Sequence, residues 1–183
     1  RAAPRARIFA VIKANAYCHG VMRVARALDA ADGAALLELD AAVRLREQGY
    51  AKRLALLEGL FAVDELAVAA ALDLTITIHD QEQLDMLDAA PAGACFDVML
   101  KINTGMNRLG FAPGQARAAC AHLMQHRAVK QLTLMTHFAT ADDARGVAWQ
   151  MEAFEEVAAG QALARSLANS AAILRFPETH ANW

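Results

Sequence analysis

Seven short apolar runs, separated by longer amphipathic segments, constrain the fold of this chain most strongly. Short runs rich in β-branched and aliphatic residues are typical of buried parallel strands. The predicted strands are Arg7–Ile12, Ala34–Leu37, Leu54–Leu57, Leu74–Ile78, Asp97–Ile102, Leu132–Thr136 and Ser166–Ala168. The predicted helices are Val21–Ala31, Leu39–Gln48, Val63–Ala71, Gln81–Ala90, Pro113–His126 and Gly146–Ala164. This alternation predicts an α/β fold with a parallel sheet and right-handed crossovers.

Helix start and stop signals support several of these boundaries. Gly33 and Gly49 follow two of the predicted helices, where a glycine commonly ends a helix. Asp80 precedes another helix as a candidate N-cap, and Pro91 ends that helix. Pro113 stands at the first turn of the next one, a position that tolerates proline.

Seven βα alternations without an internal linker predict a (β/α)8 TIM-type barrel that is one strand short. A chain of 183 residues is long enough to bury a full core, so we expect a single domain over residues 1–183. No Gly-x-Gly-x-x-Gly motif follows the first predicted strand, which argues against a dinucleotide-binding sheet.

Composition excludes several classes of function. A net charge of −2 and scattered basic residues argue against a nucleic-acid-binding or anionic-membrane surface. No apolar run approaches the roughly 18–20 residues that a membrane span needs, and no stretch resembles a signal peptide. Cys18, Cys95 and Cys120 are odd in number and lack metal-ligand spacing. We therefore expect reduced thiols, no metal site and a cytoplasmic protein.

Lys13 is the first candidate functional residue. It follows the apolar run Ile8–Ile12 at the carboxyl end of the first predicted strand. In α/β sheets and barrels this edge carries the ligand-binding and catalytic groups. The alternative from position alone is a surface lysine that caps a strand.

Four sequence blocks, in order along the chain, resemble those of the alanine racemase family. They are Val11-Ile12-Lys13-Ala14-Asn15-Ala16-Tyr17-Cys18-His19-Gly20, Lys101-Ile102-Asn103-Thr104-Gly105-Met106-Asn107-Arg108-Leu109-Gly110, Thr136-His137-Phe138-Ala139 and Ala168-Asn169-Ser170-Ala171. Cys18 stands where the family usually has glycine. A cysteine there costs on the order of 1 kcal/mol if the position requires a positive φ.

The resemblance implies a pyridoxal 5'-phosphate cofactor and a role for several residues. Lys13 would form the Schiff base with the cofactor and, once freed by the substrate, move the α-proton on one face. Tyr17 would donate its phenol to the cofactor phosphate; the alternative is a ring packed under the loop. Asn169 and Ser170 would bind the same phosphate at the start of a helical turn, although Asn-Ser is also an ordinary helix cap.

The other implied residues lie near the cofactor ring. His137 would lie against the ring; otherwise it is a strand-end histidine with its hydrogen bonds satisfied. Lys101, in an apolar strand, matches a lysine that is carbamylated in the family, and the resulting anion would hold Arg108 in place. Arg108 would then direct its guanidinium to the cofactor phenolate and the substrate carboxylate. The alternative is a strand lysine that reaches water, with Arg108 at the surface.

The implied function is interconversion of L-alanine and D-alanine for peptidoglycan synthesis, by a homodimer. In that reading the chain is a partial barrel domain, and the C-terminal β domain is absent. The second proton-transfer base would come from that domain of a partner subunit, so the 183 residues alone would be inactive. Two alternatives remain: a single-barrel cofactor carrier, or an inactive truncated paralogue. The choice among small amino acids as substrates also stays open.

Overall fold

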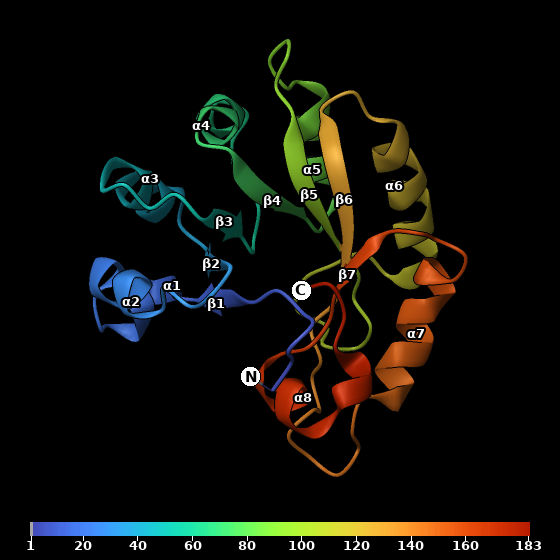
Figure 1. The fold of residues 1–183 in the computed structure, drawn as a ribbon. Coiled ribbons are helices and arrows are strands. Elements are labelled where there is room, and N and C mark those ends of the chain that lie inside the picture. The colour runs from blue at the N-terminus through green and yellow to red at the C-terminus, as the bar shows by residue number, and fades with distance from the viewer. Residues whose placement is uncertain (1) are drawn as a thin grey trace. The chain divides into compact units, whose positions relative to one another are not determined.

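The computed structural model describes residues 2–183 and, over this range, contains one seven-stranded sheet. The strands are hydrogen-bonded in chain order, from β1 to β7 (Figure 1). Their bounds are β1 Phe9–Val11, β2 Gly33–Leu36, β3 Arg53–Leu56, β4 Leu74–Ile78, β5 Phe96–Lys101, β6 Val129–Met135 and β7 Ala164–Ser166. The pairs β1–β2, β2–β3, β3–β4 and β6–β7 are parallel. Sequential strand order with a helix after each strand is the topology of an incomplete (β/α)8 barrel.

Helices connect consecutive strands throughout the described part of the chain. They are α1 Lys13–Tyr17, α2 Val21–Ala27, α3 Leu39–Glu47, α4 Glu65–Ala71, α5 Gln81–Asp88, α6 Pro113–Gln125, α7 Ala148–Ala158, α8 Ser170–Arg175 and the 3-10 turn η1 Pro177–Thr179. Asp80 caps α5 as predicted, because its Oδ1 accepts from the backbone N–H of Gln83 at 2.9 Å. No helix within residues 2–183 is long and apolar enough to cross a bilayer.

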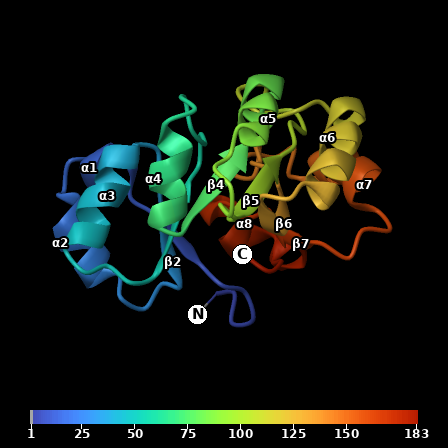
Figure 2. The same ribbon diagram turned by 90° about the horizontal axis from the view of Figure 1, so that it is seen from above.

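The chain divides into two compact units. The amino-terminal unit comprises Arg7–Val98 with Arg127–Gln131, and the carboxyl-terminal unit comprises Met99–His126 and Leu132–Trp183 with residues 2–6. In the amino-terminal unit, α2, α3 and α4 lie on the same side of β1–β4 (Figure 1). In the carboxyl-terminal unit, α6 and α7 pack side by side (Figure 2). The helices therefore cover the strands of their own unit and shield them from solvent.

Each unit has a buried hydrophobic core. In the amino-terminal unit, Leu36, Leu54 and Leu56 are fully buried on adjacent strands. In the carboxyl-terminal unit, Phe154 of α7 and Leu123 of α6 are fully buried. Burying one such side chain contributes roughly 1.5–3 kcal/mol, so these residues hold each layer of helices on its strands.

Two predicted helices are too long. The predicted segment Val21–Ala31 is helical only to Ala27, and Gly33 is the first residue of β2 instead of a helix stop. Glycine is required at Gly33 for close packing, since an added Cβ would lie 2.7 Å from both the Arg53 carbonyl and the Phe9 ring. The predicted segment Gly146–Ala164 is helical over Ala148–Ala158 only. The left-handed Gly160, at φ +76°, ends it and lets the chain enter β7.

The three cysteines have different surroundings. Cys18 and Cys95 are exposed, whereas Cys120 is buried in α6, and burial raises the pKa of its thiol. At pH 8 we therefore expect a thiol-reactive chromophore to modify Cys18 and Cys95 rapidly. Cys120 should react only after denaturant is added. The absorbance released at each stage measures this, and a third fast thiol in the folded protein would contradict the packing of α6.

Candidate functional site

Lys13 lies at the carboxyl edge of the amino-terminal unit. The backbone N–H of Ile12 donates to Ala35 of β2 at 2.9 Å, which extends the β1–β2 ladder up to the lysine. Ile12 is buried and Lys13 is half-buried, so the chain leaves the core at this residue. The parallel registers of β1 to β4 bring the ends of these four strands to the same edge. The lysine therefore stands where α/β folds place their reactive groups.

The segment after Lys13 is a left-handed helical turn. Ala14, Asn15, Ala16, Tyr17 and Cys18 all have φ between 50° and 69°. Each residue with a Cβ pays roughly 1–2 kcal/mol in this conformation, so surrounding contacts must hold the turn. The hydrogen bonds that do so run from the Ala16 N–H to Ile12, from the Gly20 N–H to Asn15, and from the Val21 N–H to the Asn15 side chain. Tyr17 ends the turn with 55% of its surface exposed.

Cys18 occupies a left-handed position, at φ +69°. Because glycine adopts this conformation without steric cost, Cys18→Gly should stabilise the folded protein by up to about 1 kcal/mol. The midpoint of denaturant-induced unfolding measures the change. Cys95→Gly is the matched control, because Cys95 is also exposed but does not have a positive φ. A loss of stability in Cys18→Gly would show that the thiol makes a compensating contact.

A buried glutamine supports the carboxyl ends of β3 and β4. The Gln83 amide, in the first turn of α5, donates to the Glu58 carbonyl at 2.7 Å and to the Leu60 carbonyl at 3.1 Å. Its oxygen accepts from the backbone N–H of His79 at 3.0 Å. The His79 ring contacts the Glu58 carbonyl as well, at 3.1 Å. One side chain thus satisfies three backbone groups and fixes two loops at the edge that also bears Lys13.

In the carboxyl-terminal unit, Lys101 is the last residue of β5 and only 7% exposed. The loop after it returns to the same strand end: the Phe111 N–H donates to Lys101 at 3.0 Å, and the Asn103 N–H donates to Phe111 at 2.8 Å. The Asn103 side chain accepts from the N–H groups of Gly105 and Asn107 within the loop. This closed loop presents Arg108 at its tip, where the guanidinium is exposed.

The remaining predicted site residues follow β6 and β7 in the same unit. His137 is half-buried, two residues beyond the end of β6. Asn169 acts as the N-cap of α8, since its Oδ1 accepts from the Ala172 N–H at 3.0 Å. Its amide donates to the Phe138 carbonyl at 3.0 Å and so joins the start of α8 to the loop after His137. Ser170, the first residue of α8, is exposed.

A second buried glutamine, Gln150 of α7, connects the loops of this unit. Its Nε2 donates to the Thr104 hydroxyl at 3.0 Å and contacts the His137 carbonyl at 3.4 Å, and its Oε1 accepts from the Ala139 N–H at 2.7 Å. The Thr104 and Thr136 hydroxyls are 2.7 Å apart. The network joins the loop that bears Arg108 to the strand end that bears His137. Gln83 and Gln150 are the two positioning residues that sequence reasoning missed.

Gln150→Leu should destabilise the protein by about 1–3 kcal/mol, because it leaves the half-buried Ala139 N–H and the buried Thr104 hydroxyl without their Gln150 partner. The free energy of unfolding in denaturant measures this loss. Gln115→Leu is the matched control: Gln115 is exposed in α6, so the same substitution should change stability little. Equal stability of the two variants would mean that the Gln150 hydrogen bonds make no net contribution to the free energy of unfolding.

Each unit, taken by itself, offers groups that suit an aldehyde-bearing, phosphorylated cofactor. The amino-terminal unit offers the Lys13 amine, which can form an imine with an aldehyde, and the exposed Tyr17 phenol. The carboxyl-terminal unit offers the exposed Arg108 guanidinium and the exposed Ser170 hydroxyl. These groups are hydrogen-bond donors of the kind that bind phosphate and phenolate oxygens. The Asn169 side chain is already engaged as a cap, so its part would be to position Ser170.

Comparison with known proteins identifies relatives along the whole chain. The family model described as "Alanine racemase, N-terminal domain" matches residues 1–183. An alanine racemase of Nitrosospira multiformis is 55% identical over all of this chain and 52% of its own length, and one of Paraburkholderia phytofirmans is 50% identical over all of this chain and 51% of its own. The crystal structure of a biosynthetic alanine racemase from Pseudomonas aeruginosa matches with a TM-score of 0.94 and 42% identity, covering all of this chain and 52% of that one. The chain thus spans about half the length of the curated relatives it matches.

Proposed function

Because the chain belongs to the family of alanine racemase N-terminal domains, we propose that the intact protein interconverts L-alanine and D-alanine with pyridoxal 5'-phosphate. The observation that carries the proposal is the position of Lys13, at the carboxyl end of β1 and at the start of a left-handed turn. Bound pyridoxal 5'-phosphate would supply an electron sink that makes the α-proton of an amino acid acidic.

Each residue of this chain then has a defined task. With the cofactor bound, Lys13 would hold it covalently, and the Lys13 amine, once freed, would take or return the α-proton of the substrate on one face. Tyr17 and Ser170 would donate to phosphate oxygens, and His137 would contact the cofactor ring. Arg108 orients the substrate carboxylate with its planar fork. Lys101, buried at the end of β5, supports Arg108 when it is carbamylated.

Racemisation also needs an acid–base group on the opposite face of the α-carbon. A proton removed by one base must be replaced from the other side, or the configuration does not change. We propose that a tyrosine in the C-terminal domain of a partner subunit supplies this group, and that the active protein is a homodimer. The product D-alanine would serve peptidoglycan synthesis in the cytoplasm.

The test is formation of D-alanine from L-alanine by the intact gene product, measured with a D-amino-acid oxidase coupled assay. We expect turnover that depends on added pyridoxal 5'-phosphate, and none from residues 1–183 alone. Cofactor binding without turnover by the intact product would instead favour a cofactor carrier. Absence of both would favour an inactive paralogue. Parallel assays with L-serine and L-lysine decide the substrate class.

A further inference from the structure

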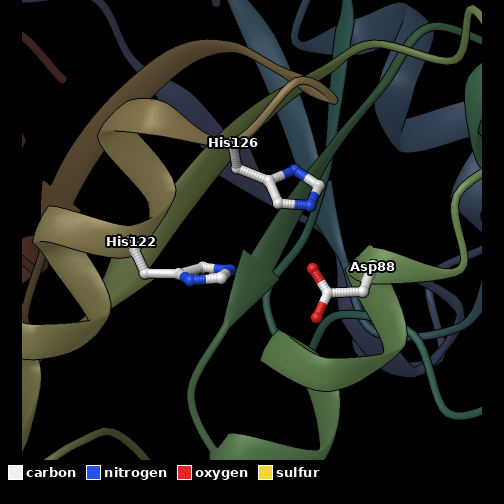
Figure 3. A group of neighbouring side chains, drawn as sticks. All are labelled: Asp88, His122 and His126. Carbon is white, nitrogen blue, oxygen red and sulfur yellow. The ribbon is translucent and has the colours of Figure 1, made fainter.

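Two histidines at the end of α6 form a cluster that the proposed racemase site does not use. His122 lies in the last turn of the helix, and His126 is its C-cap residue. The two rings are 5.6 Å apart between centroids and tilted by 33° (Figure 3). Figure 3 also draws Asp88 of α5, which belongs to the other compact unit.

The spacing and exposure of the pair suit a metal ion. Residues four apart on a helix project from the same face, and histidines in this arrangement are known zinc ligands. A ring nitrogen of His122 lies within 4.8 Å of one of His126. In a tetrahedral zinc site two ligand nitrogens lie roughly 3.3 Å apart, so side-chain rotations that bring the two nitrogens about 1.5 Å closer suffice. His122 is exposed and His126 half-buried, so an ion can reach both rings from solvent.

The position of the pair favours a cation as well. The last carbonyl groups of a helix carry a partial negative charge, which attracts positive ions to the C-terminus. The His126 N–H donates to the Leu123 carbonyl at 3.2 Å, so the residue is already held against the final turn. An ion that binds both rings would therefore cross-link the two ends of the last turn of α6.

We propose that His122 and His126 form a binding site for a divalent late transition-metal ion, with Zn²⁺ as the ion of choice and water as the remaining ligands. Neutral imidazoles are suitable ligands for Zn²⁺, Cu²⁺ and Ni²⁺. The site is distinct from the proposed racemase site. His126 precedes β6, whereas His137 follows it, so the pair and His137 flank opposite ends of that strand. The ion would be structural and would not enter the chemistry.

Calorimetric titration of the intact gene product with Zn²⁺ tests the proposal, after removal of any polyhistidine tag and of bound metal. We expect one site that weakens by at least about tenfold in His122→Ala and in His126→Ala. Gln125→Ala, an exposed neighbour on the same helix turn, should bind Zn²⁺ like the wild type. Because both histidines are solvent-accessible, the variants should fold, and circular dichroism verifies this. Absence of binding by the wild type, or equal affinity in the wild type and both histidine variants, would overturn the proposal.

Discussion

Lys13→Ala is expected to abolish racemisation in the intact gene product and to lower kcat by at least ~10⁴-fold, as removal of a catalytic nucleophile does in other enzymes. The variant loses both the covalent anchor of the cofactor and the acid–base group for one face of the substrate. Neither Tyr17 nor Ser170 offers an amine, so neighbouring groups cannot replace it. Borohydride reduction followed by peptide mass analysis provides a readout independent of activity. The cofactor mass should appear on the Lys13 peptide of the wild type and be absent from the variant.

Lys130→Ala controls for the general loss of one lysine, because Lys130 is exposed in β6 and far along the chain from the left-handed turn. This control should retain the wild-type rate and the labelled peptide. Cofactor mass on another lysine of the wild-type protein would remove the basis of the proposed function. The zinc titration is independent of that result, because it measures metal binding by His122 and His126 and not the attachment of a cofactor to Lys13.

The sheet was predictable because its pattern is local. Each strand is a short apolar run between turn residues. For β4 the predicted bounds, Leu74–Ile78, are those of the structure. Elsewhere the predicted strand ends differ by a few residues from those of the structure. β6 begins at Val129, earlier than the predicted Leu132, because the polar Lys130 and Gln131 interrupt the apolar run without interrupting the ladder. The pattern of apolar residues indicates which side chains are buried. A strand, in contrast, continues for as long as its backbone is hydrogen-bonded to a neighbouring strand.

The left-handed turn after Lys13 was not predictable from local preference. Ala14 and Ala16 have the side chain that most favours a right-handed helix, yet both have φ near +50°. Tertiary contacts override that preference: Ala16 is buried, and the Asn15 side chain holds the Val21 N–H. Strain of this kind is common where a reactive group must be presented in one orientation.

The roles of Gln83 and Gln150 depend on contacts that a linear pattern does not contain. Both stand in the first turn of a helix, but only Gln150 has apolar neighbours on both sides, Trp149 and Met151, which is the one available signal. Their partners are backbone groups of loops, as far as 25 residues away in the chain for Gln83, and for Gln150 also the Thr104 hydroxyl, 46 residues away. Sequence reasoning could find the residues of the candidate site by family resemblance, but not the amides that hold the site's loops.

Arg108→Lys should lower kcat/KM for alanine by about 10- to 100-fold while leaving stability unchanged. The substitution keeps the positive charge but removes the planar fork that binds a carboxylate through two parallel hydrogen bonds. Stability should not change, because Arg108 is exposed and lies at the tip of a loop held by Asn103. Steady-state kinetics and a denaturant titration on the same preparation separate the two effects.

Arg117→Lys is the matched control, since Arg117 is exposed in α6 and makes one long hydrogen bond, to the Glu156 carbonyl at 3.3 Å. It should keep the wild-type kcat/KM.

Lys101 provides a second measurement. At neutral pH, the mass of the intact protein should include one carbamate, which Lys101→Met removes. A buried lysine that becomes an anion gives Arg108 a fixed counter-charge, so the carbamate and the kinetic defect should occur together. An unmodified Lys101 beside a fully active Arg108→Lys variant would refute the paired role of these residues.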